Sequence, residues 1–166
     1  MPEPSSDEFP RDGVLFGIDF GTKRVGVSVS DMYQKYASPL ENYARQSLIA
    51  DAKFFRRLAE DFRPVGLVVG LPIHLSGDES EKSTQAREYA AWLSATLSLP
   101  VAFQDERFSS VQAEMLLIQA EMTKKQRQAR LDKLAAQVLL QAFLDARSPA
   151  TSGMPSESPT SNTTQE

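Results

Sequence analysis

The sequence contains no cysteine and a single histidine, His74. Without cysteine the chain can form neither disulfide bonds nor a cysteine-bound zinc site, so packing alone must stabilise its fold. A histidine-based nuclease or a zinc hydrolase needs more imidazole groups than this chain offers. Neither class of enzyme therefore fits the sequence, and His74 itself is more simply explained as an exposed loop residue.

The sequence also lacks any apolar run long enough to span a membrane. Residues 1–13 carry Glu3, Asp7 and Glu8, where a signal peptide would have a basic segment followed by an apolar one. We therefore expect a cytoplasmic protein with no membrane partner.

An excess of basic residues is missing too, because the formal net charge is −4. The acidic excess lies at the two ends: the segments before Gly13 and after Arg147 contain six acidic residues and only one basic residue, Arg11. The segment between them is close to neutral. The overall charge therefore neither supports nor excludes a polyanionic partner such as a nucleic acid.

Composition divides the 166 residues into three parts. Residues 148–166 are rich in Ser, Thr and Pro and nearly free of apolar side chains, so they cannot offset the entropy lost on ordering. Residues 1–12 are similar. We predict disorder in both end segments and one folded domain over residues 13–147.

Hydrophobic periodicity predicts the elements of this domain. In residues 14–20, Phe16 and Ile18 share one face of a strand, whereas Gly17 and Asp19 share the other. Further strands are expected at 25–30, 36–43, 67–69 and 101–104. Helices are expected at 48–62, with Ser47 as its N-terminal cap, and at 86–97, 109–120 and 128–145, with a mobile loop at 121–127. This order predicts an α/β fold: a mixed five-stranded sheet, with a three-stranded antiparallel meander, parallel strands, and helices on both faces.

Four acidic residues occupy unusual positions. Asp19 lies within an apolar strand, where Asp is disfavoured, although bonding to nearby turn amides would also explain it. Asp105 and Glu106 follow a strand directly, at the end where α/β proteins gather ligands, although a solvated loop is the usual fate of such a pair. Asp132 begins the inward-facing stripe of the last helix, although the helix dipole alone would favour an acid there.

These acids come from a first strand, a later strand end and a C-terminal helix, and such elements can converge on one crevice. A cluster of carboxylates would hold Mg²⁺ or Mn²⁺. Two such ions can activate a water and stabilise the leaving oxygen during phosphodiester hydrolysis. The acids together therefore predict a metal-dependent nuclease.

The same residues lie in segments that resemble the YqgF/RuvX family of the ribonuclease H-like superfamily. Gly17–Asp31 reads GIDFGTKRVGVSVSD and resembles the opening motif of that family. Three later segments resemble its other motifs in the same order: VVGLP at Val68–Pro72, DERFSS at Asp105–Ser110 and LDKLAA at Leu131–Ala136. A single such motif would be weak, but four in order cover nearly the whole domain.

The resemblance implies that Asp19, one acid of the pair Asp105 and Glu106, and Asp132 are catalytic metal ligands, and we favour Glu106 within the pair. It implies a two-metal-ion mechanism with Mg²⁺ or Mn²⁺. It also implies a nucleic-acid substrate, either the 5′ end of pre-16S ribosomal RNA, which we place first, or a Holliday junction. The protein would act as a monomer or a weak homodimer.

Basic residues near these acids are candidates for phosphate contacts that do not read sequence. A solvated charged face is the alternative explanation for the basic run before the last helix. The candidates are Lys23, Arg24, Arg107, Lys124, Lys125, Arg127 and Arg130.

Two other classes of protein share features with this sequence. The turn Asp19–Thr22 resembles the first phosphate motif of actin-like ATPases, but those proteins need two such domains, and this chain is too short for a second. A non-catalytic RNA-binding module with the same fold is the other alternative. Such a module gains nothing from clustered carboxylates, which repel a polyanion.

Overall fold

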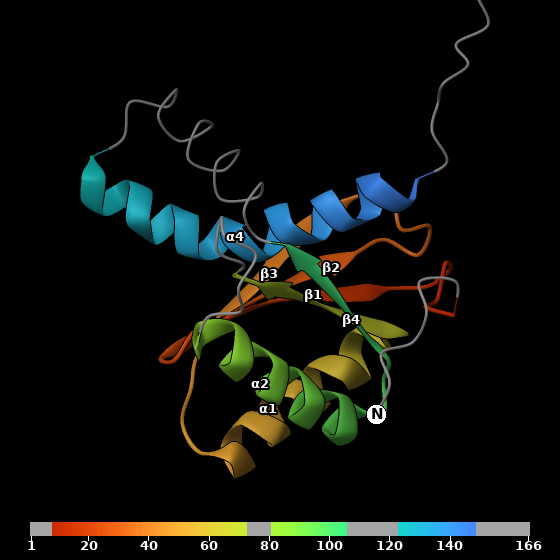
Figure 1. The fold of residues 1–166 in the computed structure, drawn as a ribbon, viewed down its shortest axis with the longest axis horizontal. Helices are drawn as coiled ribbons and strands as arrows, with labels where there is room; N and C mark the ends of the chain where they lie inside the picture. Colours follow the sequence, from red (N-terminus) through yellow and green to blue (C-terminus); the bar gives the residue numbers. More distant parts are fainter. Residues whose placement is uncertain (1–7, 73–80, 106–122, 149–166) are drawn as a thin grey trace, which may run out of the picture.

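The computed structural model describes residues 8–72, 81–105 and 123–148, with the side chains of residues 124, 125 and 127–133 outside that description. Its centre is one five-stranded sheet in the order β3-β2-β1-β4-β5 (Figure 1). The strands are β1 (Leu15–Phe20), β2 (Arg24–Ser30), β3 (Ala37–Ala44), β4 (Gly66–Leu71) and β5 (Val101–Asp105). β1, β2 and β3 pair antiparallel, whereas β1, β4 and β5 pair parallel. The predicted meander and parallel strands are thus confirmed.

Helices cover both faces of the sheet, as predicted (Figure 1). Helices α1 (Leu48–Phe62) and α2 (Glu81–Leu97) cover one face, and the long helix α4 (Lys124–Arg147) covers the other. Ser47 caps α1 as its sequence indicates, because its hydroxyl accepts the Ala50 N–H at 3.1 Å. The predicted helix at 109–120 lies outside the described residues.

The alternation of β1 explains how one strand serves two cores. Phe16 and Ile18 are fully buried against α1 and α2 in one apolar cluster. Leu15 points to the other face and is buried with Leu140 and Phe143 of α4. The faces assigned to β1 from its sequence are therefore correct.

Helix α4 begins earlier than predicted. Residues 124–127 were expected in a mobile loop, but they form the first turn of α4. The reason is a capping box: the Thr123 hydroxyl accepts the Gln126 N–H, and the Gln126 side chain accepts the Thr123 N–H. This polar pair begins the helix without any apolar periodicity, so the hydrophobic pattern missed it.

Residues just before β1 also pack against the end of α4. Phe9 is only 3% exposed and its ring meets the ring of Phe143 edge to face. Arg147 donates hydrogen bonds to the Phe9 and Pro10 carbonyls, both at 2.9 Å. The end of α4 therefore holds the residues that precede β1.

Helix α4 approaches the sheet closely at Gly17. A Cβ atom there would collide with Ser28 Oγ and would lie 2.8 Å from Leu140 Cβ and 3.0 Å from the Ala136 carbonyl. The Ser28 hydroxyl, fully buried, donates a 2.6 Å hydrogen bond to that same Ala136 carbonyl. A glycine and a small polar side chain thus let the helix rest directly on β1 and β2.

We expect Gly17→Ala to lower the free energy of unfolding by about 1–3 kcal/mol, because the added methyl group overpacks this contact. Ala44→Ser, at the exposed end of β3, is the control and should change stability by less than about 0.5 kcal/mol. Urea denaturation of the two variants measures both effects. Equal stability of Gly17→Ala and the parent chain would show that α4 is not held so closely.

Candidate nucleic-acid-cleaving site

Asp19 lies near the carboxyl end of β1, opposite Gly26 of β2, and its side chain is half-buried. Because β1 alternates, Asp19 shares the α4 face with Leu15 and Gly17. An ionisable side chain on this covered face is what the sequence predicted for Asp19.

The direction of α4 brings its first half toward Asp19. Leu144, near the end of the helix, packs in the same cluster as Leu15 at the beginning of β1, whereas Ala136, earlier in the helix, lies over Gly17. The helix and β1 therefore run in opposite directions. Later residues of β1 therefore lie beside earlier residues of α4.

This arrangement brings the backbone positions of Asp19 and Asp132 to the same region. From Gly17 the strand advances about 6.8 Å to Asp19. From Ala136 the helix goes back about 6 Å to Asp132, one turn earlier on the same face. Two residues 113 positions apart in the chain thus end up beyond the same contact point.

Asp105 lies on the other face of the sheet. In β5, Val101 and Phe103 pack against the α1–α2 cluster, and Ala102 packs against the α4 cluster. By the same alternation Asp105, which pairs with Leu71 of β4, lies on the α1–α2 face. The structure thus does not bring Asp105 to the face of Asp19, and Glu106 lies outside the described residues.

The predicted phosphate-binding residues divide into three groups. Lys23 and Arg24 are exposed, in the β1–β2 turn that follows Asp19 and at the beginning of β2. Arg107 lies outside the described residues, as does His74, which was expected to be an exposed loop residue and not a phosphate contact. The others belong to the first turns of α4, which extends past the edge of the sheet in Figure 1, and their side chains are not described: Lys124, Lys125, Arg127 and Arg130.

Sequence reasoning missed a buried polar network that holds the turn after Asp19. The Arg45 guanidinium donates hydrogen bonds to the Gly21 and Thr22 carbonyls, at 3.5 and 3.2 Å. The same group lies against the rings of Phe20 and Tyr89, 5.1 and 5.0 Å from their centres. Arg45 therefore ties the β1–β2 turn to the helices on the opposite face of the sheet.

Asp51 of α1 is the acidic partner of this network and is only 1% exposed. Its carboxylate accepts the Tyr43 hydroxyl at 2.8 Å and the Gln46 N–H at 3.0 Å, and it lies 3.9 Å from Arg45 Nε. A signal for it existed in the sequence: Asp51 stands among the apolar residues of the α1 stripe, where a charge needs partners.

Within the described residues, no group of three or more His, Cys, Asp or Glu side chains forms a metal site. Two of the three proposed ligands, Glu106 and Asp132, have no described side chain. Among those same residues, no helix has the length and apolar character to cross a membrane.

The sheet order, the helices on both faces and the carboxylate on the central strand define a ribonuclease H-like fold. A solved structure with this fold is RuvC of T. thermophilus in complex with a Holliday junction. It has a TM-score of 0.51 and 18% sequence identity, over 81% of this chain and 95% of that chain. At this identity the likeness concerns the fold.

The chain belongs to the RuvX family, whose model is described as a Holliday junction resolvase and matches residues 13–146. A relative from Rhodopirellula baltica, named "Putative pre-16S rRNA nuclease", is 44% identical over 86% of this chain and 82% of its own length. A relative of the same name from Koribacter versatilis is 41% identical, over 89% of this chain and 94% of its own length. The predicted family is thus confirmed, and the nuclease interpretation is favoured over the actin-like ATPase.

We expect Asp51→Ala to destabilise the protein by about 1–3 kcal/mol, because it leaves the partly buried Tyr43 hydroxyl and Arg45 guanidinium without their acidic partner. Asp61→Ala, at an exposed position of the same helix, is the matched control, with an expected change below about 0.5 kcal/mol. Thermal unfolding of both variants tests this. Similar stability of the two would mean that the buried network contributes little.

Tyr43 makes the stability of the protein sensitive to alkali. Burial, and then its hydrogen bond to Asp51, raise the pKa of Tyr43 to about 12. In the unfolded chain tyrosine ionises near pH 10. The stabilisation is therefore complete below about pH 10 and is lost progressively as the pH rises toward 12, because the unfolded state releases its proton first.

Tyr43→Phe removes the hydroxyl and should flatten this alkaline loss while lowering the stability at neutral pH by about 1 kcal/mol. The measurement is the free energy of unfolding between pH 8 and pH 11 for both proteins. Parallel curves for Tyr43→Phe and the parent chain would contradict the assignment.

Proposed function

We propose that this protein is a divalent-metal-dependent nuclease that cleaves precursor 16S ribosomal RNA near its 5′ end. The observation that carries the proposal is the close contact of Gly17 with Ala136. Because β1 and α4 run in opposite directions, the positions of Asp19 and Asp132 both lie beyond this contact. The names of the relatives in Rhodopirellula baltica and Koribacter versatilis support the choice of substrate.

The donor set fits a hard divalent cation. Asp19 comes from β1 and Asp132 from α4, and both positions offer carboxylate oxygens, which Mg²⁺ and Mn²⁺ prefer. When bound, one or two such ions would supply an activated water and stabilise the leaving oxygen of the phosphodiester. The protein's part is to hold its carboxylates ionised and close together.

We propose Glu106 rather than Asp105 as the third ligand. Asp105 is on the α1–α2 face of β5, away from Asp19. In an extended chain the next side chain has the opposite direction. The placement of Asp105 on the face away from Asp19 therefore supports the preference for Glu106.

The proposed substrate contacts are electrostatic. Lys23 and Arg24 are exposed immediately after the Asp19 strand and can bind phosphates on one side of the site. The first turns of α4 extend about 12 Å beyond Asp132 and carry Lys124, Lys125, Arg127 and Arg130, which we propose for the other side. Arg107 completes the proposed set.

The test is cleavage of a precursor-16S rRNA fragment by the purified chain with Mg²⁺ or Mn²⁺. We expect Asp19→Asn, Glu106→Gln and Asp132→Asn each to lower the rate of cleavage by more than about 100-fold. A loss of about 100-fold is the most that is usual for a residue that only supports a metal ligand, so a larger loss indicates a ligand. Asp61→Asn, an exposed acid of α1 on the other face of the sheet, is the matched control and should cleave normally. Asp105→Asn should retain more activity than Glu106→Gln.

Equal cleavage by Asp19→Asn and the parent chain would contradict the proposal, since the activity would then come from a contaminant. The description of the family model favours a second candidate function, resolution of Holliday junctions. A synthetic four-way junction is therefore tested in parallel. Cleavage of the junction but not of the RNA would select this second function.

A further inference from the structure

The β2–β3 connection at residues 31–36 is a rigid loop that presents side chains to solvent. The Asp31 carboxylate accepts three backbone N–H groups, from Lys35 and Tyr36 at 2.8 Å and from Tyr33 at 3.1 Å. Burial acts to raise the pKa of Asp31, but these three donors outweigh it and hold the pKa below its usual value. The Asp31 carboxylate is thus a stable centre for the loop.

The same loop is attached to both of its neighbours. The Gln34 side chain donates to the Pro10 and Gly13 carbonyls, at 3.2 and 3.1 Å. The Gln141 side chain of α4 donates to the Lys35 carbonyl at 3.0 Å. The loop therefore keeps one shape without help from its own exposed side chains.

Two large aromatic side chains stand on this fixed loop with most of their surface in water: Tyr33 is 75% exposed and Tyr36 is 71% exposed. Neither ring adds to the core of the protein. A preorganised, exposed ring is suited to stack on a flat partner, because little conformational entropy is lost on binding.

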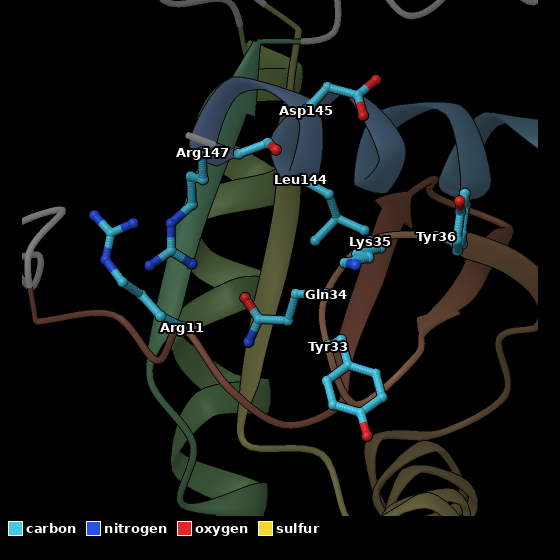
Figure 2. A pocket seen from close by; sticks show the side chains of 9 residues that line it. Arg11, Tyr33, Gln34, Lys35, Tyr36, Leu144, Asp145 and Arg147 are labelled. Atoms are coloured by element: carbon cyan, nitrogen blue, oxygen red, sulfur yellow. The ribbon is translucent and has the colours of Figure 1, made fainter. Parts of the chain in front are cut away.

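Beside these rings is a cavity of about 470 Å³ with a basic lining (Figure 2). Arg11, Lys35 and Arg147 contribute three positive charges to it, and Asp145 contributes one negative charge. Burial and then the charge of Arg11 lower the pKa of Arg147, so the two guanidinium groups repel each other. An anion between them would relieve this repulsion.

We propose that this cavity binds single-stranded RNA, with unpaired bases stacked on Tyr33 and Tyr36 and a phosphate held by Arg11, Lys35 and Arg147. Stacking on aromatic side chains beside basic groups is the general means by which proteins hold unpaired strands. A fully base-paired four-way junction offers no free bases, so the cavity suits the RNA substrate better.

The cavity lies at the opposite end of α4 from the proposed catalytic acids. Leu144, which lines it, is twelve residues after Asp132, or about 18 Å along the helix. A strand stacked at about 3.4 Å per nucleotide would span that distance with about five to six nucleotides. The proposal rests on the proposed function only in the choice of RNA as the ligand. In it, the cavity binds a single-stranded part of the RNA that flanks the cleaved bond.

The experiment measures binding of a fluorescent 20-nucleotide single-stranded RNA to the full chain by anisotropy, without divalent ions, so that no cleavage occurs. We expect Tyr33→Ala and Tyr36→Ala each to weaken binding about tenfold, within the range for loss of one stacked base. Lys35→Ala should weaken binding and also reduce its dependence on salt. The backbone bonds to Asp31 remain in all three variants.

Matched controls come from α1. Ile49→Ala removes an apolar side chain that is 85% exposed, and Lys53→Ala removes an exposed lysine. Both should bind the RNA as the parent chain does. A fully paired RNA duplex should bind equally to the parent chain and to the tyrosine variants, because it presents no free base.

Photo-crosslinking gives a second measurement. With 5-iodouridine in the RNA, we expect crosslinked peptides that contain Tyr33 or Tyr36. Unchanged RNA affinity in both tyrosine variants, or crosslinks only outside residues 31–36, would overturn the proposal. If the parent chain cleaves the RNA and the cavity variants bind it normally, the cavity proposal is wrong and the proposed nuclease function stands. If the cavity variants lose RNA binding and the parent chain shows no metal-dependent cleavage, the nuclease function is wrong and the cavity proposal stands.

Discussion

The close contact between α4 and the central strands is the constraint on which the rest of the structure depends. Gly17 leaves room for the Ala136 carbonyl, and the buried Ser28 hydroxyl satisfies that carbonyl at 2.6 Å. A larger side chain at position 17 or position 28 would push the helix away from the sheet. The proposed metal site needs this contact, because the contact fixes α4 on the sheet, and the position of α4 decides how near Asp132 lies to Asp19.

The antiparallel direction of α4 and β1 gives the helix two ends with different surroundings. Its first turns lie past the end of β1 that carries Asp19 and bear the basic run of the sequence. Its last turn holds Phe9 and Pro10 through Arg147 and lines the cavity with Tyr33 and Tyr36. A single rigid element thus separates the proposed cleaving site from the proposed strand-holding site by a fixed length.

The opposite face of the sheet supports the turn that follows Asp19, beside the proposed cleaving site. Arg45 bonds to the carbonyls of the turn after Asp19 and lies against Phe20 and Tyr89. Asp51 completes the network from α1 with almost no exposure to water. A flexible turn after Asp19 would let the position of the Asp19 carboxylate vary. The network of Arg45 and Asp51 restricts the motion of that turn.

The alternation in β1, the Ser47 cap, the strand directions and the family could all be predicted from the sequence, because period, capping chemistry and motif order are local properties of the chain. The early start of α4 was missed, since Thr123 and Gln126 carry no apolar signal. The opposite faces of Asp19 and Asp105, the partners of Asp51 and the basic cavity at residues 31–36 depended on tertiary structure. Each of these joins residues that are distant in sequence, and only the packing of helices on a particular register of strands decides which of them meet.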